Sequence, residues 1–264
     1  MNESSAVARQ GVGLLIIGDE ITRGKRQDKH FSKVVELLAA RGLVLDWAMY
    51  LGDDRERLTE TLRRTMRETL ASGDIVFSCG GIGATPDDHT RQAAAAAAGV
   101  ELLLHPEAAA LIRERLQELK RDVTEDALGM ARFPAGAGLV PNPFNRIAGF
   151  SLGSHYFVPG FPQMAWPMIE WVLDTYYADR FNRQPTAEAA ILVWDGIESI
   201  LTPMMQRIEA DFSGLKVFSL PSLGTPDRGR HIELGVRGVP DQVAPAMDVL
   251  RREVAALGYR FDET

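Results

Sequence analysis

A glycine-rich segment is the strongest candidate binding site in the sequence. Gly80, Gly81 and Gly83 follow the apolar run 74–79 and precede a helix expected over 89–98. Glycines between a buried strand and a helix let backbone N–H groups approach an anion, and the helix N-terminus favours negative charge. Thr85 adds a hydroxyl donor. The spacing is neither a Walker loop nor a GxGxxG fingerprint, and a tight turn capped by Asp87 or Asp88 explains it equally well.

Pairs of acidic residues follow three expected strands: Asp19 with Glu20, Asp53 with Asp54, and Asp87 with Asp88. The carboxyl ends of parallel strands meet at one edge of a sheet, so we expect these six carboxylates to converge on the glycines. Mg²⁺ is usually bound by one or two carboxylates plus substrate phosphates. The sequence therefore predicts a magnesium site here, unless each pair only caps its own helix.

Other polar side chains near this segment have competing interpretations. Lys25, Arg26 and Lys29 either contact phosphates or form a solvated basic loop. His30 and His89 flank the expected pocket, and a surface imidazole is the favoured interpretation of each. Cys79 is expected to be a buried thiol, because the sequence places no base beside it.

The elements that must position these residues alternate between strand and helix. Strands are expected over 11–18, 43–51 and 74–79, and helices over about 31–41, from 55 onwards, over 89–98 and over 106–120. This order predicts an α/β domain with a mostly parallel sheet and helices on both faces. Short strands near 138–140 and 155–158 and a helix over 163–180 follow. After a linker at 182–186, the expected order is a strand at 189–194, a helix at 197–211, strands at 217–220 and 231–236 joined by a turn at 224–230, and a helix at 240–258. This β-α-β-β-α order suits a small α+β domain with helices on one face of an antiparallel sheet.

Length and charge narrow the function class. The 264 residues fit a disordered N-terminus at 1–10, a large domain at 11–181 and a small one at 187–264. The net charge of −7 argues against wide nucleic-acid binding and against a basic membrane surface. A single cysteine forbids an internal disulfide. The first residues do not read as a signal peptide, so we expect a cytoplasmic protein.

Several motifs together resemble the molybdopterin-binding domain family. They are GDEIT at 18–22, GDD at 52–54, GGIGATPDDHT at 80–90, PNP at 141–143, AGF at 148–150 and PGFP at 159–162. The chain is most similar to the N-terminal domain of the competence/damage-inducible protein A branch, and residues 187–264 resemble the small linking domain of that branch. The branch's C-terminal deamidase domain is expected to be absent, because the sequence ends at Thr264.

The resemblance implies a three-layer α/β/α domain that binds a phosphorylated pterin or nucleotide. It implies ligand-binding roles for Gly18, Asp19, Glu20, Gly80, Gly81, Gly83, Thr85, Asn142, Gly149, Pro159 and Gly160. Asp53 and Asp88 fall on the two aspartates that matter in the adenylyltransferase branch. With Asp19 they are the candidate metal ligands, and Mg²⁺ is the expected metal.

The chain departs from the family pattern at three places. Lys29 and His30 replace the Thr and Asn of an Asp-Thr-Asn string. The pattern Asn-Pro-x-Gly-x-Ala-Pro-Gly-Phe loses its first Gly and second Pro at 142–150, and Pro-Gly-x-Pro-x-Glu-Met loses its Glu at 159–165. We expect a metal-dependent pyrophosphatase acting on ADP-ribose or FAD. The alternatives are an adenylyltransferase of molybdenum cofactor synthesis and a binding module without turnover. We also expect a homo-oligomer, a dimer or trimer.

Overall fold

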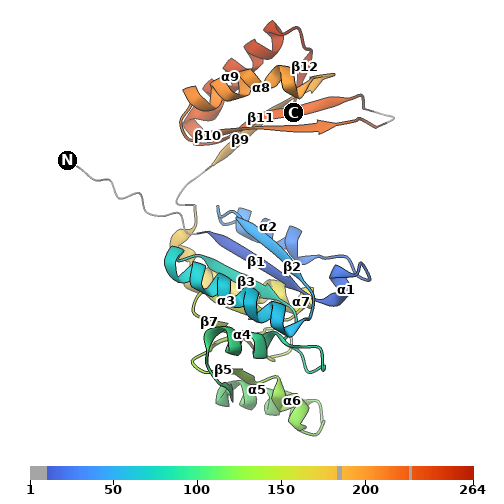
Figure 1. Ribbon diagram of the computed structural model, residues 1–264, viewed down its shortest axis with the longest axis vertical. Helices are drawn as coiled ribbons and strands as arrows, with labels where there is room; N and C mark the ends of the chain where they lie inside the picture. The colour runs from blue at the N-terminus through green and yellow to red at the C-terminus, as the bar shows by residue number, and fades with distance from the viewer. Residues whose placement is uncertain (1–10, 183–185, 226–227) are drawn as a thin grey trace, which may run out of the picture. The chain divides into compact units, whose positions relative to one another are not determined.

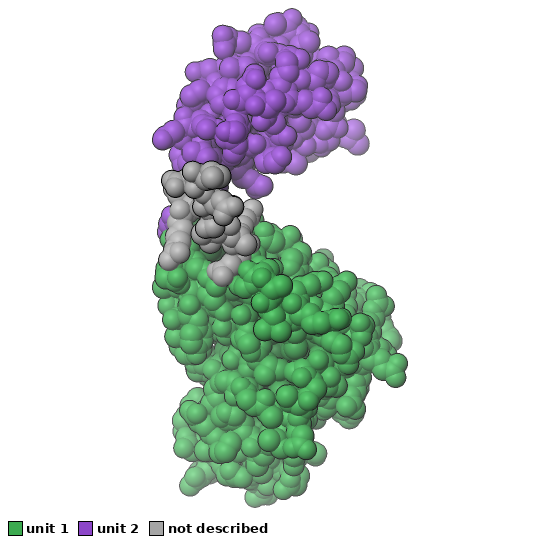
Figure 2. All heavy atoms as spheres, turned by 60° about the vertical axis from the view of Figure 1, so that its left-hand side comes forward, with its two compact units in different colours: residues 1–181 green, residues 182–264 purple. Residues whose placement is uncertain are grey.

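The structure is a computed structural model that describes residues 11–182, 186–225 and 228–264. The expected disorder at 1–10, most of the linker and part of the turn at 224–230 lie outside these residues. The chain divides into two compact units, residues 1–181 and 182–264, which Figure 2 draws in green and purple. No helix in the described part of the chain is long and apolar enough to cross a membrane.

Unit 1 is built on a six-stranded sheet in the order β2-β1-β3-β8-β7-β6. Its strands are β1 (Val12–Ile17), β2 (Trp47–Leu51), β3 (Ile75–Cys79), β6 (Gly138–Val140), β7 (Gly149–Leu152) and β8 (His155–Val158). β1 pairs in parallel with β2 and β3, and β3 pairs in parallel with β8. Only β7 runs against its neighbours. The predicted mostly parallel sheet is confirmed.

Helices cover both faces of this sheet, because the side chains of each strand alternate between the two faces. Leu14 and Ile16 pack with α2 (His30–Ala39) and α7 (Pro162–Tyr176) on one face. Leu15 and Ile17 pack with α3 (Arg55–Ser72) and α4 (Thr90–Ala98) on the other. The three-layer α/β/α arrangement is visible in Figure 1.

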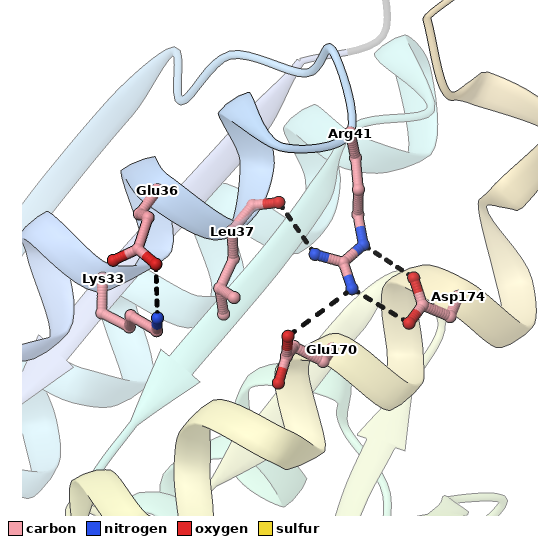
Figure 3. A network of polar contacts seen from close by, with 6 residues as sticks. All are labelled: Lys33, Glu36, Leu37, Arg41, Glu170 and Asp174. Carbon is pink, nitrogen blue, oxygen red and sulfur yellow. Dashed lines mark hydrogen bonds and ion pairs between the residues drawn. The ribbon is translucent and has the colours of Figure 1, made fainter.

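An ion-pair network ties α2 to α7 (Figure 3). The Arg41 guanidinium donates to both carboxylate oxygens of Asp174, over 2.6 and 2.9 Å, and lies 3.7 Å from Glu170. Its remaining terminal nitrogen donates to the Leu37 carbonyl. The Arg41 guanidinium therefore caps the C-terminal end of α2 and links it to α7.

Short elements of unit 1 escaped the sequence pattern. They are α1 (Asp19–Thr22), β4 (Leu102–Leu104), α6 (Glu125–Gly129), β5 (Arg132–Pro134) and the 3-10 turn η1 (Ala178–Arg180). The helix expected over 106–120 is present as α5 (Pro106–Glu118). β4 and β5 form a separate two-stranded sheet. The second strand begins at Trp47 rather than at residue 43, and α7 ends at Tyr176 rather than at residue 180.

Unit 2 is a four-stranded antiparallel sheet with two helices on one face (Figure 1). The sheet order is β10-β11-β9-β12, with β9 (Ala187–Trp194), β10 (Leu215–Ser222), β11 (His231–Gly238) and β12 (Phe261–Glu263). The helices are α8 (Glu198–Asp211) and α9 (Pro240–Ala256). They share one apolar core with the sheet. The expected α+β domain is confirmed, and β12 is an additional strand at its edge.

Candidate functional site

The carboxyl ends of the parallel strands form one edge of the unit 1 sheet, which we call the carboxyl edge. Gly18 and Asp19 follow β1, Asp53 follows β2, and Gly80 and Gly81 follow β3. Pro159 and Gly160 follow β8, and Asn142 follows β6, which runs parallel to β8. Gly149 begins the antiparallel β7 and so lies at the same edge. The topology therefore brings the sequence-predicted residues of six chain segments to one edge.

The segment Gly80–His89, here called the glycine loop, is held from one side by the start of α4. The Thr90 hydroxyl donates to the Gly80 carbonyl over 3.0 Å, and the Thr90 amide donates to the Gly81 carbonyl over 3.0 Å. The Arg91 guanidinium donates to the Ile82 carbonyl and, over 2.7 Å, to the Gly83 carbonyl. Four successive carbonyls thus point toward two residues of one helix.

This arrangement leaves four successive backbone amides facing the other way. In a trans peptide the N–H points opposite to the preceding C=O, and every described peptide bond here is trans. The amides of residues 81–84 donate to no acceptor within the described residues. Successive amides that point into one concavity form an anion-binding nest. Four successive amides without an acceptor in the described residues are thus available at this loop.

Glycine is required at two positions of the loop. Gly80 and Gly81 have φ of 115° and 68°, a region that L side chains rarely adopt. A Cβ on Gly80 would lie 2.1 Å from the Ile17 carbonyl oxygen, and a Cβ on Gly81 would lie 2.2 Å from the Thr90 hydroxyl oxygen. At Gly83 a Cβ would meet only the Asp88 carboxylate, at 2.6 Å. The absence of side chains at Gly80 and Gly81 therefore allows the loop backbone to pass close to Ile17 and Thr90.

The polar end of the glycine loop is organised around Asp88. Its carboxylate accepts hydrogen bonds from the Thr85 amide over 2.8 Å and from the Thr85 hydroxyl over 2.5 Å. The prediction that Asp87 or Asp88 caps the following helix is wrong, because the residue at the N-cap of α4 is His89 and no side chain caps it. Asp88 closes the loop instead, and the Thr85 hydroxyl is directed at a carboxylate.

Two aspartates cross-link the ends of β1 and β2. The Asp19 amide donates to the Asp53 carboxylate over 2.8 Å, and the Asp53 amide donates to the Asp19 carboxylate over 3.3 Å. The Gly52 position allows this approach, since a Cβ there would lie 2.5 Å from an Asp19 oxygen. Arg23 pairs with Asp19 at 2.5 Å. The two carboxylates are thus fixed beside each other by backbone donors.

Four carboxylates form an acid cluster at the carboxyl edge: Asp19, Glu20, Asp53 and Asp87. Burial raises the pKa of Asp53, and the charges of the other three raise it further against the hydrogen bond from Asp19. The expected convergence holds for these four. It is wrong for Asp54, which caps α3 by accepting from the Arg57 amide over 2.8 Å, and for the predicted metal ligand Asp88, whose carboxylate accepts from Thr85 instead.

The acid cluster offers the oxygen ligands that Mg²⁺ prefers, but too few of them to bind the ion without other ligands. Within the described residues no group of three or more His, Cys, Asp or Glu side chains has metal-binding geometry. Mg²⁺ needs only one or two carboxylates when a phosphate completes its shell. Asp19 and Asp53, with oxygen donors and a raised Asp53 pKa that a cation would relieve, meet that requirement.

The opposite wall of the edge is the turn at Pro159–Gly160. Here His30 is 4% exposed, and its Nε2 lies 3.0 Å from the Gly160 carbonyl oxygen, so the expectation of a surface imidazole is wrong. A Cβ on Gly160 would be 3.5 Å from the Gly80 Cα. The turn therefore lies directly against the glycine loop, and His30 holds it from the α2 side.

Asn142 and Gly149 support this wall from within. The Asn142 side chain donates to the Ile147 carbonyl and accepts from the Phe144 amide, each over 3.0 Å, and is 3% exposed. A Cβ on Gly149 would lie 2.2 Å from the Phe157 carbonyl oxygen. Both residues shape the edge through contacts with the chain itself.

Sequence reasoning missed the residues that act from behind the site. Thr90 and Arg91 orient the glycine loop, but they lie in an alanine-rich helix. The spacing of residues in the sequence does not show that Arg91 is buried. Arg91 is 5% exposed; burial lowers the pKa of its guanidinium while the Asp88 charge raises it. Lys25, Arg26 and Lys29 are exposed. Cys79 is buried, and burial raises the pKa of its thiol, which opposes a nucleophilic role.

Known proteins resemble this chain in sequence. A CinA-like protein of Geobacter metallireducens is 32% identical over 210 residues, which cover 77% of this chain and 50% of that protein. A CinA-like protein of Desulforapulum autotrophicum is 30% identical over 215 residues, covering 78% of this chain and 50% of that protein. The chain thus spans about half the length of these two relatives.

One solved structure has the same fold. The crystal structure of the protein CinA, of unknown function, from Thermoplasma acidophilum superposes with a TM-score of 0.55 at 22% identity, covering 62% of this chain and 98% of that one. Residues 13–178 match the family described as "Probable molybdopterin binding domain", and these residues run from β1 to the end of α7. Because that match takes in more than half of the sequence and every segment of the carboxyl edge, this chain belongs to the molybdopterin-binding domain family.

Proposed function

We propose that unit 1 binds a phosphorylated pterin or nucleotide at the carboxyl edge, with a phosphate on the glycine loop. The observation that carries this proposal is the set of four unpaired amides at residues 81–84, oriented by Thr90 and Arg91. The buried Arg91 cation behind the loop adds positive potential. Membership of the molybdopterin-binding domain family supports a pterin-like or nucleotide-like ligand.

We further propose that Asp19 and Asp53 hold Mg²⁺ when such a ligand is bound. The ion would neutralise charge on phosphoryl oxygens and lower the pKa of water. It would also explain why an acid cluster lies beside a phosphate loop, since the two would otherwise repel each other. The negative charges of Asp19, Glu20 and Asp87, which raise the pKa of Asp53, support this assignment.

The reaction we propose is hydrolysis of a nucleotide diphosphate of the ADP-ribose or FAD type. Asp53 would hold the Mg²⁺ that lowers the pKa of the attacking water, and its carboxylate is fixed by the Asp19 amide. Asp88 stays a candidate for the chemistry, and its contacts with Thr85 give it a loop-closing role as well. Adenylyl transfer to molybdopterin and binding without turnover are the alternative outcomes.

The experiment uses the full chain and separates binding from turnover. Calorimetry with inorganic pyrophosphate, with and without Mg²⁺, tests the loop; release of AMP from ADP-ribose, FAD and NAD tests the chemistry. We expect pyrophosphate to bind more tightly with Mg²⁺ and AMP to appear only with Mg²⁺. Binding without AMP release leaves a binding module, and AMP transfer to molybdopterin identifies the transferase. Absence of pyrophosphate binding under both conditions would remove the glycine loop from the site.

Two properties expected from the sequence complete the proposal. We propose a cytoplasmic homo-oligomer, a dimer or trimer, that acts on a small phosphorylated ligand and on neither nucleic acid nor membrane. Light scattering of the purified full chain measures the oligomeric state, and a monomer at micromolar concentration would contradict it.

A further inference from the structure

The exposed phenylalanines of this chain are confined to one place. The sequence has 11 phenylalanines, and the structure describes all of them. Only Phe31, Phe144 and Phe161 are more than a third exposed, at 43%, 62% and 58%. Phe77, Phe133, Phe150 and Phe157 are fully buried. The remaining four are partly buried, so these three are the most exposed phenylalanines, and exposed apolar side chains that gather in one place mark an interaction site.

These three residues, here called the aromatic rim, belong to segments that meet at the turn Pro159–Gly160. Phe161 follows Gly160 directly. Phe31 follows His30, whose ring contacts the Gly160 carbonyl over 3.0 Å. Phe144 precedes Asn145, whose amide group lies 3.6 Å from the Met164 sulfur in the first turn of α7. Three segments that are distant in sequence thus meet around one turn of the carboxyl edge.

The aromatic rim is continuous with the glycine loop, because the Gly160 backbone lies against Gly80. A phosphate on residues 81–84 would place the rest of its ligand next to this turn.

We infer that Phe144 and Phe161 stack on the flat heteroaromatic ring of the phosphorylated ligand, with Phe31 as the third side of the rim. This inference rests on the proposed phosphate site and adds the part of the ligand that the phosphate does not explain. Aromatic faces bind any planar ring and read little of its edge. The polar groups next to the rim, on Asn142 and Asn145, are already paired within the protein. The rim thus selects ligands that carry a ring and discriminates weakly between rings.

The test compares a ring-bearing probe with a ring-free probe. Calorimetry with ADP and with inorganic pyrophosphate, both with Mg²⁺, is carried out on the full chain and on Phe144→Ala, Phe161→Ala and Phe161→Trp. We expect each alanine variant to bind ADP between about 5-fold and about 150-fold more weakly, the range for losing one base–aromatic stack. Pyrophosphate affinity should stay unchanged, and Phe161→Trp should restore ADP affinity.

A matched control removes an exposed ring elsewhere. Tyr176, which is 52% exposed, ends α7, roughly 21 Å along the helix from its first residue. Tyr176→Ala should leave both affinities at the wild-type value. Thermal melts show that each variant is folded.

Each other outcome overturns the inference in a distinguishable way. If ADP and pyrophosphate weaken equally, the phenylalanines only shape the loop. If ADP affinity is unchanged and light scattering shows a smaller assembly, the rim is a contact between copies of the chain. Wild-type protein that binds ADP but not pyrophosphate contradicts the phosphate site, while the ADP affinities of the variants still decide the rim. Wild-type protein that binds neither probe contradicts both proposals.

Discussion

Replacing Gly81 with alanine tests how the glycine loop is built. The backbone at Gly81 has φ of 68°, which costs an alanine about 1–2 kcal/mol. The new methyl group would also lie 2.2 Å from the Thr90 hydroxyl, so the buried hydrogen bond from Thr90 to the Gly80 carbonyl must break, at about 1 kcal/mol. We expect Gly81→Ala to lower the unfolding free energy of unit 1 by about 2–3 kcal/mol.

Two glycines serve as controls for the two parts of this sum. Gly153 has φ of 57° and no atom within 4 Å of an added Cβ, and it lies in the β7–β8 turn at the opposite end of the sheet. Gly153→Ala should therefore cost only the backbone part, about 1–2 kcal/mol. Gly83 lacks positive φ, and the methyl group of Gly83→Ala would displace the Asp88 oxygen that accepts both Thr85 hydrogen bonds, so the variant should cost only the hydrogen-bond part, about 1 kcal/mol.

The assay is urea unfolding followed by tryptophan fluorescence, with pyrophosphate calorimetry on the same samples. Trp47, Trp166 and Trp171 report on unit 1. Pyrophosphate affinity should fall at least about tenfold, or about 1.4 kcal/mol, in Gly81→Ala and stay constant in Gly153→Ala. The reasoning fails if Gly81→Ala costs no more stability than Gly153→Ala, or if it binds pyrophosphate like the wild type.

Four further predictions follow from single interactions. Asp53→Asn should raise the melting temperature of the free protein at pH 7, because the raised pKa of Asp53 means that its charged form destabilises the fold. This gain in melting temperature should vanish as the pH falls through the pKa of Asp53 toward 3.8. AMP release should be lost at all pH values. His155 is buried, and burial lowers its pKa to about 4, so unit 1 should lose about 3 kcal/mol of stability as the pH falls from 6.5 to 4. His155→Gln should flatten this dependence of stability on pH, and an unchanged dependence would show that His155 is not its cause. Asp174→Asn should cost about 0.5–1 kcal/mol at pH 7, since Asp174 is 55% exposed, and this cost should shrink as the pH falls from 3.8 through the lowered pKa of Asp174. A cost that does not shrink below pH 3.8 would show that charge is not the cause. A fragment ending at Phe181 should melt like unit 1 of the full chain, because the apolar clusters of unit 1 contain no residue beyond it; loss of cooperative melting would refute this division.

The sequence determined the features that depend on local pattern. Uniform apolar runs identified β1 and β3, alternation of strand and helix fixed a parallel sheet, and parallel strands bring their carboxyl ends to one edge. For this reason the residue order alone placed Asp19, Asp53 and the glycine loop together. Three residues carry little periodicity, so the sequence revealed only one strand of this length, β6, and not β4, β5 or β12.

The tertiary structure decided how the site is held. Arg91 binds two loop carbonyls and His30 binds the Gly160 carbonyl across 130 residues of sequence, and neither contact follows from spacing. The contact of Asp88 with Thr85 rather than with the acid cluster depends on where segments distant in sequence come together. The same is true of the exposure of Phe144 and Phe161. The physical reason is that residue types fix the chemistry a side chain can do, whereas its partners are set by packing between elements that only the complete fold brings into contact.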